Sequence, residues 1–318
     1  MDKIVLDHVS YVYNAGTPFE KKALDDVSIS IASNCITGVI GHTGSGKSTM
    51  MMLLNGLAAP SAGKVLLDGY DISSTFKEIL PEWLKLPEYA NMRKSTAKKA
   101  IKAEILKRKK TLCFRVGLVM QYPEYQLFEE TVYKDIAYGP KNMKLSDEEI
   151  KERVYEAIRF CGLEESILQK SPFDLSGGQK RRVALAGVIA MRPEILVLDE
   201  PAAGLDPRGR EQIFQEVRRY QQLTGSTVII VSHSMEDMAE YCRDMIVLAH
   251  SKVVAQGSCK DVFSNVSMLE GIGLDIPQIT QLTRLLKERG LEIPGDVYTV
   301  DRAFELLKGL YQTKKGTT

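Results

Sequence analysis

The 318-residue sequence predicts an α/β fold in which a buried parallel sheet carries a nucleotide-binding loop. The first observation is the octapeptide Gly41–Ser48, which has the P-loop spacing G-x-x-x-x-G-K-S. A β-branched apolar segment precedes it and a helical segment follows it, as that motif requires. The second observation is a pair of apolar runs, Ile195–Leu198 and Val228–Val231, that end in polar residues. Buried parallel strands have this pattern, and ligands bind at their carboxyl ends.

The composition of the chain excludes several classes of protein. The 42 basic and 41 acidic residues give a net charge of +1, which does not indicate a nucleic-acid partner. The five cysteines form no C-x-x-C pair, so we expect neither a metal site nor a disulfide framework, and a reducing cytosol fits. No signal peptide is evident, and no apolar stretch approaches the ~18–20 residues of a membrane helix. Any link to a membrane is therefore expected to depend on a partner.

Two alternating segments precede the P-loop. Ile4–Tyr13 and Leu24–Ile31 alternate apolar and polar residues, and the turn residues of Asn14–Pro18 lie between them. This pattern predicts an antiparallel pair of strands. Tyr13 ends the first segment and is a candidate to stack on the adenine ring of a nucleotide. A core or cross-strand tyrosine is the alternative interpretation.

The P-loop residues have distinct expected roles. Gly44 and Gly46 allow a tight turn that points backbone N–H groups at phosphate oxygens, and the following helix adds a favourable dipole. Lys47 is expected to contact the β- and γ-phosphates, and the Ser48 hydroxyl to bind Mg²⁺. The residues of this segment assigned to ATP binding are Gly41, His42, Thr43, Gly44, Ser45, Gly46, Lys47, Ser48 and Thr49.

A basic stretch interrupts the α/β pattern over residues 73–110. Residues 97–109 have helical composition, with Ile101, Ile105 and Leu106 expected on one side. We interpret the stretch as a surface insertion outside the catalytic machinery. Its basic helix is either simply solvated or in contact with anionic lipid headgroups or a partner protein.

Regular structure resumes after the insertion. Residues 114–120 are predicted to form a strand that Gln121 ends. A helix is expected to begin after Ser146, because Glu149 three residues on completes a capping box. Another helical region is predicted over residues 175–186.

Two carboxylates and a histidine follow the buried apolar runs. Asp199 suits coordination of Mg²⁺, and Glu200 suits orientation of the attacking water. A buried carboxylate pair without a cation would be strongly unfavourable. His233 ends the second run, where it is expected to face the γ-phosphate, although an isolated histidine is more often structural.

Past residue 271 the alternation of strands and helices stops. Helices are expected over residues 277–290 and 300–311, with a turn between them. We therefore predict a nucleotide-binding domain over residues 1–265 and a small helical unit for dimerisation or docking over residues 266–318.

The ordered motifs resemble those of the ATP-binding-cassette (ABC) ATPases. Leu175–Gln179, Leu-Ser-Gly-Gly-Gln, is similar to the signature of that family. The other matching elements are the P-loop, Gln121 as the Q-loop, Asp199-Glu200 as Walker B, Gly204–Asp206 as the D-loop and His233 as the switch histidine. The resemblance implies a RecA-like parallel core, an antiparallel β subdomain and an α-helical signature subdomain.

The resemblance also implies ATP hydrolysis between two cassettes arranged head to tail. In this arrangement Gln121 joins the ATP and Mg²⁺ site that contains Ser48 and Asp199, while Glu200 and His233 are catalytic. Asp206 lies in the D-loop. The signature residues contact the ATP held by the partner cassette and not the ATP of this chain: Ser176, Gly177, Gly178 and Gln179.

Within that family, the chain looks like the ATP-binding subunit of an energy-coupling factor (ECF) importer of vitamins, other micronutrients or transition-metal ions. The resemblance rests on Tyr122–Phe128 after the Q-loop and on residues 277–282, and the P-loop residues His42-Thr43 look like the second of two paralogous ATPases. It implies a second ATPase, an integral membrane coupling subunit and a substrate-binding membrane subunit as partners. It also implies a peripheral position at the cytoplasmic face of the cell membrane.

Two departures from the family pattern and three alternatives remain. The basic insertion makes the spacing between Lys47 and Gln121 unusually long, and Ala202 stands where the family commonly has threonine. The alternatives are the ATPase of another ABC transporter, a soluble ABC protein and a small-molecule kinase. Three acids after the Q-loop either receive a basic helix of the membrane subunit or are solvated: Glu124, Glu129 and Glu130.

Overall fold

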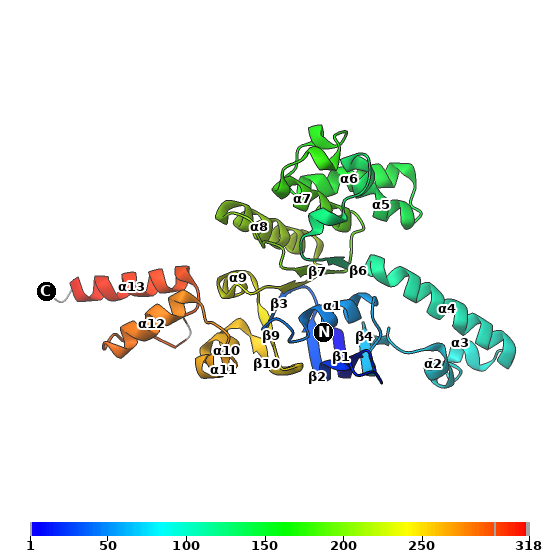
Figure 1. Cartoon of the computed structure of the whole chain (residues 1–318), viewed down its shortest axis with the longest axis horizontal. Coiled ribbons are helices and arrows are strands. Elements are labelled where there is room, and N and C mark those ends of the chain that lie inside the picture. The colour runs from blue at the N-terminus through cyan, green and yellow to red at the C-terminus, as the bar shows by residue number, and fades with distance from the viewer. Residues whose placement is uncertain (1, 296, 316–318) are drawn as a thin grey trace.

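The computed structural model describes residues 2–295 and 297–315, and its core is a parallel sheet (Figure 1). Within these residues the sheet has six strands in the order β10-β9-β3-β8-β7-β6. The strands are β3 (Ile36–Ile40), β6 (Val116–Val119), β7 (Ile195–Asp199), β8 (Thr227–Val231), β9 (Asp244–Ala249) and β10 (Lys252–Ser258). All neighbours pair in parallel except β10, which forms an antiparallel pair with β9. The predicted α/β fold is confirmed.

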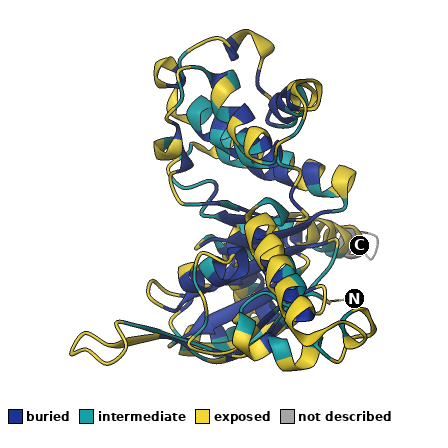
Figure 2. Ribbon diagram, turned by 90° about the vertical axis from the view of Figure 1, so that its right-hand side faces the viewer, coloured by how far each residue is buried: buried dark blue, intermediate teal, exposed yellow. Residues whose placement is uncertain are grey.

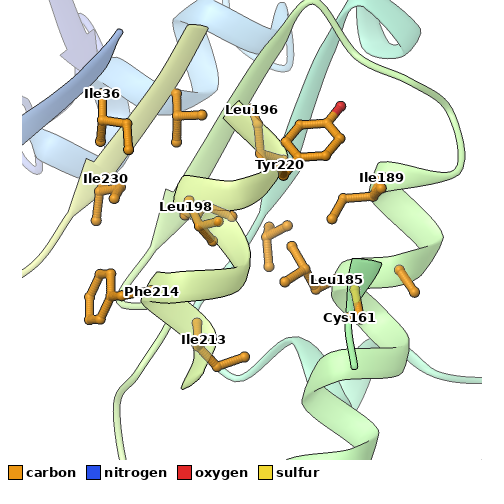
Figure 3. Close-up of a cluster of buried hydrophobic side chains, with 14 of the residues drawn as sticks. Ile36, Cys161, Leu185, Ile189, Leu196, Leu198, Ile213, Phe214, Tyr220 and Ile230 are labelled. Atoms are coloured by element: carbon orange, nitrogen blue, oxygen red, sulfur yellow. The ribbon is translucent and has the colours of Figure 1, made fainter. Parts of the chain in front are cut away.

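Both faces of this sheet are buried. In β7, Leu196 and Leu198 belong to one apolar cluster, and Ile195 and Val197 belong to another on the opposite face. Figure 3 shows the first cluster, in which Phe214 packs near the strands. This two-sided burial explains why the strands read as continuous apolar runs in the sequence.

A second sheet covers the other face of the core. Among the described residues it has four antiparallel strands in the order β2-β1-β4-β5. The strands are β1 (Asp2–Tyr13), β2 (Lys21–Ala32), β4 (Ala62–Leu67) and β5 (Tyr70–Asp71). The predicted antiparallel pair is therefore present, and it closes with Tyr13 opposite Lys21.

Helix α1 (Lys47–Asn55) begins inside the P-loop and lies between the two sheets (Figure 1). Gly46 precedes it with φ of 108°, and a Cβ there would lie 2.5 Å from the Ala23 carbonyl oxygen. Only glycine fits this position. Gly56, with φ of 78°, ends the helix.

A mainly helical subdomain is inserted between β6 and β7. Its helices are η1 (Pro123–Gln126), α5 (Val132–Asn142), α6 (Asp147–Phe160), η2 (Glu165–Ile167), η3 (Pro172–Asp174) and α7 (Gly177–Ile189). The predicted capping box at Ser146 and Glu149 is present. Helix α8 (Pro207–Thr224) follows β7 and packs between the sheet and this subdomain (Figure 1).

The basic stretch forms a helical hairpin that projects from the core (Figure 1). It comprises α2 (Phe76–Trp83), α3 (Pro87–Ala90) and α4 (Lys94–Arg115), and we call residues 76–115 the insertion hairpin. Two expectations were wrong in detail. Phe114 belongs to α4 and not to the next strand, because the helix continues without a break to Arg115. Leu106 is 48% exposed, because the buried face of α4 follows Ile101 and Ile105.

The C-terminal part begins with α9 (Met235–Tyr241), α10 (Cys259–Ser264) and α11 (Val266–Gly271), which pack on the core. The last two helices, α12 (Gln278–Glu288) and α13 (Val300–Lys315), share a separate small apolar cluster. Residues 316–318 of the predicted helical unit lie outside the described part of the chain. Leu269 and Ile276 still pack in the main core, so the separate cluster begins after residue 276.

An ion-pair network ties the antiparallel sheet to the core sheet. Glu194 accepts hydrogen bonds from Arg115 at 2.7 Å and from Lys3 at 2.7 Å, and both cations also bind Asp68. The Arg115 guanidinium, opposed by partial burial, lowers the pKa of Glu194 from 4.5 to about 2.

We expect Glu194→Gln to lower the free energy of unfolding by only about 1 kcal/mol at pH 7, because the pair is half-exposed. Because folding lowers the pKa of Glu194, its ionised carboxylate stabilises the fold at pH values above the unfolded-state pKa of 4.5. This stabilisation is lost as the pH falls from there towards the folded-state pKa of about 2. Urea unfolding of the wild type and of Glu194→Gln at pH 7 and at pH 4 measures the difference between their free energies of unfolding. This difference should be smaller at pH 4. A difference that does not change with pH would contradict the lowered pKa of Glu194.

Candidate nucleotide-binding site

A cavity of about 350 Å³ opens at the carboxyl edge of the core sheet, above the N-terminus of α1. Its walls come from five segments that are far apart in the sequence. They are Tyr13, Lys21, Ala23, Thr43, Gly44, Gly46, Lys47, Ser48, Thr49, Gln121, Asp199, Glu200 and His233. The fold therefore brings the P-loop, the Q-loop glutamine, the Walker B carboxylates and the histidine together around one space.

Lys47 is the buried cation of this cavity. Its ammonium donates hydrogen bonds to the carbonyl oxygens of Gly41 and, at 2.9 Å, of His42. Burial lowers its pKa, whereas Glu200 and Asp199 partly offset that effect. Both acceptors are neutral backbone groups, so the positive charge remains available to an anionic ligand.

Asp199 and Glu200 reach the same cavity because the backbone turns at the end of β7. Glu200 adopts φ of 48°, and its N–H still bonds to the Val231 carbonyl of β8 at 2.9 Å. This left-handed residue breaks the alternation that would otherwise place adjacent side chains on opposite faces. The turn therefore lets both carboxylates line the cavity.

The charged forms of both carboxylates are disfavoured in this cavity, although the charge of Lys47 opposes that effect. Burial and the neighbouring Glu200 raise the pKa of Asp199 to about 6. Burial also raises the pKa of Glu200. Glu200 Oε1 lacks a hydrogen-bond partner among the described residues, whereas Oε2 accepts a bond from Ser232 at 3.4 Å. The site thus presents one buried carboxylate oxygen, Glu200 Oε1, whose hydrogen-bonding capacity is unused by these residues.

His233 lies beside Glu200 at the end of β8, with its Nε2 3.5 Å from Glu200 Oε1. Its side chain is 54% exposed, so it is not a core histidine. Burial and then the charge of Lys47 lower its pKa, which favours a neutral ring near neutral pH.

Tyr13 and Lys21 form the side of the cavity that belongs to the antiparallel sheet. The Tyr13 hydroxyl lies 3.1 Å from Thr49 Oγ1, and its ring packs edge-on against Tyr11. Lys21 was not predicted as a site residue. The pairing of Tyr13 with Lys21 across the turn brings it there, and the alternation of the two segments is the signal that could have located it.

Three P-loop positions do not line the cavity with their side chains. Gly41 and Ser45 are buried beneath the loop. His42 points away, and its Nε2 lies 2.9 Å from the carbonyl oxygen of Ile272, which follows α11. Any contribution of these residues to phosphate binding would therefore come from the backbone.

The signature and the D-loop lie outside this cavity. Ser176 caps α7 in a capping box with Gln179, and of the two glycines between them Gly177 is exposed and Gly178 is half-buried. Asp206 caps α8 by accepting a hydrogen bond from the Gly209 N–H at 2.7 Å. The start of α7 is an N–H-rich helix terminus that does not line this cavity.

A buried ion pair that sequence reasoning missed connects the Q-loop segment to the signature helix. Arg181 of α7 donates two hydrogen bonds of 3.1 Å to Glu124, and it also donates to the Ala203 carbonyl oxygen. Its guanidinium lies 5.8 Å from the centre of the Tyr122 ring. Of the three acids discussed above, Glu124 is therefore occupied within the chain, and Glu130 pairs with Lys134.

We expect Arg181→Met to lower the free energy of unfolding by about 3 kcal/mol, because it leaves the Glu124 carboxylate partly buried and unpaired. The control is Arg192→Met, since Arg192 also binds two carboxylates but is 45% exposed and should change stability by less than about 1 kcal/mol. Urea unfolding followed by circular dichroism measures both. Equal effects of the two substitutions would contradict the special role of the buried pair.

Comparison with known proteins now decides the family. A model described as ABC transporter matches residues 24–203. The chain belongs to the ABC transporter family. A second model, an AAA domain, matches the shorter segment 169–238.

The ABC family assignment extends to a particular group of ATPases. The chain is 47% identical to the energy-coupling factor transporter ATP-binding protein EcfA2 of Caldanaerobacter subterraneus, over 98% of this chain and 99% of that protein. The sequence-based resemblance to ECF ATP-binding subunits is thereby confirmed.

Two solved ABC structures are also similar. One is cbiO1 from Clostridium perfringens, described as part of the ABC transporter complex cbiONQ, with 32% identity and a TM-score of 0.66 over 89% of this chain and 99% of that chain. The other is a dimeric post-hydrolysis structure of the ATP-binding cassette MJ0796 bound to ADP and phosphate. It is 25% identical, with a TM-score of 0.62 over 80% of this chain and 98% of that chain.

The described helices include none whose length and hydropathy meet the requirements of a transmembrane segment.

Proposed function

We propose that this chain is the ATP-hydrolysing subunit that powers an ECF-type importer of vitamins or other micronutrients. The observation that carries the proposal is the single cavity that joins the P-loop, Gln121, Asp199, Glu200 and His233. ABC ATPases couple hydrolysis to transport, and the relatives that match nearly the whole chain are named ECF transporter ATP-binding proteins.

The residues of the cavity suit a magnesium ion bound together with ATP. Mg²⁺ prefers oxygen ligands and takes only a few from the protein, with substrate phosphates and water completing the octahedron. Ser48, Gln121 and Asp199, which all line the cavity, offer a hydroxyl, an amide and a carboxylate. The described residues contain no cluster of three or more His, Cys, Asp or Glu that could hold a metal by itself. A bound cation would also favour the charged form of Asp199, whose pKa burial and the charge of Glu200 raise to about 6.

Each remaining group of the cavity has a role in the proposed reaction. Lys47 and the P-loop N–H groups hold the phosphates of ATP, and Tyr13 contributes its ring to the nucleotide side of the cavity. Glu200 Oε1, which has no hydrogen-bond partner among the described residues, accepts a proton from the attacking water. His233 contacts the γ-phosphate from the end of β8. When bound, Mg²⁺ neutralises charge on the phosphates.

The second half of each catalytic site comes from another cassette. At the start of α7, Ser176 and Gly177 are exposed and Gly178 and Gln179 are half-buried, and none of the four lines this chain's own cavity. They are therefore free to bind the phosphates of an ATP held by a second ABC ATPase, facing head to tail. Asp206 lies at the start of α8, where the D-loop of the family meets the partner. Closing around two ATP molecules and reopening after hydrolysis is the two-state motion that drives transport.

The membrane coupling subunit docks, in this proposal, on the groove between the core and the helical subdomain. A cavity of about 350 Å³ there is lined by Phe114, Phe128, Tyr138 and Met191 among others. Phe128 is 59% and Tyr138 is 48% exposed, and their rings pack edge-on. Exposed aromatic side chains beside a groove are typical anchors for a partner helix. From this proposed docking position we infer that the chain lies peripherally at the cytoplasmic face of the membrane.

Residues 1–265 are proposed as the ATPase domain and residues 266–318 as the dimerisation or docking unit. The apolar side chains of Leu285 and Phe304 on α12 and α13 are 54% and 60% exposed. They offer a surface for the second ATPase. The basic insertion over residues 73–110 lines no part of the nucleotide cavity, which supports its place outside the catalytic machinery.

The test of this proposal is phosphate release from ATP by the detergent-purified complex captured through this chain. We expect magnesium-dependent hydrolysis that Lys47→Ala abolishes. Transfer of the γ-phosphate to a small molecule, or no consumption of ATP, would contradict an ATPase role and favour the small-molecule kinase alternative.

A further inference from the structure

We propose that the insertion hairpin binds the anionic headgroups of the lipid bilayer beside the transporter. This inference rests on the proposed function, which places the chain at a membrane through its partners. It adds a direct contact between this subunit and lipid.

The charge of the hairpin differs from that of the rest of the chain. Residues 76–115 contain twelve Lys or Arg and four Glu, whereas the whole chain has a net charge of only +1. The remainder of the chain is therefore net negative. Positive charge concentrated in one projecting segment attracts an anionic surface without making the whole protein basic.

The lysines of α4 face solvent because the opposite side of the helix is occupied. Ile101 and Ile105 are buried with Ile79 in a small cluster that holds α2 against α4. Lys94, Lys98 and Lys102 recur every four residues, so they form one row along the exposed side. The basic row is thus fixed on a folded element, and Figure 2 looks onto the side of the molecule from which it projects.

Arg108 is not part of this free row. Its guanidinium lies over the Tyr70 ring at 4.5 Å and the Trp83 ring at 5.0 Å, and it pairs with Glu104. These contacts attach the hairpin to the antiparallel sheet. Arg108 is therefore a structural residue, and the proposed contact with lipid belongs to the lysines nearer the tip.

The tip of the hairpin combines apolar and basic residues. Leu86 is 41% and Met92 is 45% exposed, and Lys85 and Arg93 stand next to them in the sequence. Apolar side chains flanked by cations are typical of segments that lie in the interface of a bilayer. An acidic protein surface would not require the exposed apolar residues.

The base of the hairpin lies at the groove proposed for the membrane subunit. Cys113 and Phe114, at the end of α4, line that groove together with Phe128 and Tyr138. Figure 1 shows α4 running outward from the core beside β6. A membrane subunit seated in the groove would therefore place the bilayer on the side of the chain from which the hairpin projects.

A lipid surface fits these features better than a nucleic acid does. Trp83 and Tyr89 of the hairpin stack on each other, with their ring centres 6.2 Å apart, so their rings are not open to nucleotide bases. Both rings pack against the buried cluster of the hairpin. The basic row on α4 therefore lacks the stacking platform typical of single-strand binding.

The experiment measures co-sedimentation of the full chain with vesicles. One set contains equal parts of phosphatidylcholine and phosphatidylglycerol, and the other contains phosphatidylcholine alone. The test variant replaces four exposed lysines of α4 with glutamine, which keeps helix propensity nearly unchanged: Lys94, Lys98, Lys99 and Lys102. The control variant has the same change in net charge at four exposed lysines elsewhere: Lys64, Lys151, Lys170 and Lys287.

We expect the wild-type chain to bind the anionic vesicles and not the neutral ones, and to release them as salt rises. The test variant should bind at least about tenfold more weakly, whereas the control variant should bind as the wild type does. Equal binding by test variant and wild type, or equal loss in both variants, would overturn the proposal. Preferential binding of a short DNA duplex by the wild-type chain would also overturn the lipid proposal. So would a test variant that no longer binds the membrane subunit but still binds the vesicles.

A deletion separates this proposal from the proposed function. Replacing residues 73–110 with a short Gly-Ser bridge should abolish vesicle binding by the isolated chain and leave ATP binding unchanged. If ATP hydrolysis by the complex persists while the wild-type chain binds no vesicles, the lipid contact is wrong and the ATPase role stands. If the wild-type chain binds vesicles but the complex hydrolyses no ATP, the proposed function is wrong.

Discussion

Glu200→Gln should lower ATP turnover of the assembled complex by roughly 10²–10⁴-fold, the usual effect of losing a general base. ATP binding should survive, because the substitution keeps the size of the side chain and removes one negative charge near the γ-phosphate. Glu200 Oε1 has no hydrogen-bond partner among the described residues and lines the nucleotide cavity. The complex should therefore accumulate with ATP bound and the cassettes closed.

Lys47→Ala is the contrasting control, because it removes the buried cation of the P-loop and should weaken binding itself. Nucleotide affinity and turnover are measured for both variants in the reconstituted complex. Near-normal turnover in Glu200→Gln would remove Glu200 from the catalytic role. His233, whose Nε2 lies 3.5 Å from Glu200, would then be examined as the base.

Ser176→Arg should reduce hydrolysis by the complex by about 10²–10³-fold, the range found when a preorganised anion site is lost. ATP binding to the isolated chain should change little, because Ser176 is exposed on the helical subdomain and does not line the chain's own cavity. The long cationic side chain would occupy the space expected for the partner's ATP.

The matched control is Ser146→Arg, since Ser146 also caps a helix of the same subdomain in a capping box. Both substitutions lose a cap worth about 1 kcal/mol, but only the first faces the proposed partner. Loss of ATP binding in the folded Ser176→Arg monomer would show that the head-to-tail arrangement is wrong. Equal loss of hydrolysis in the two variants would point to a general effect on the subdomain.

The sequence predicts the parts of this molecule that depend on local patterns. The P-loop, the buried runs before Asp199 and His233 and the capping box at Ser146 follow from spacing and periodicity, and all appear where expected. Parallel strands place their carboxyl ends at one edge, so the meeting of Gln121 with the Walker B carboxylates could also be anticipated.

Features that depend on distant packing could not be predicted. Glu124 and Arg181 are 57 positions apart, and nothing in either segment indicates that the Arg181 guanidinium is buried against the Glu124 carboxylate. The side chain of His42 points away from the P-loop and lies within hydrogen-bond distance of the Ile272 carbonyl oxygen, although the place of His42 in the P-loop motif suggested a contact with ATP. Phe114 has strand-like neighbours but continues α4, because helix extension from the insertion overrides local propensity there.

The measurement that tests the central claim most directly is the subunit composition of the native complex. A tag on this chain is used to purify it from detergent-solubilised membranes, and mass spectrometry identifies what remains bound. We predict a second ABC ATPase with its own P-loop and signature, together with integral membrane subunits. Recovery of the chain only from the soluble fraction, alone or with ribosomal or DNA-repair proteins, would contradict the account.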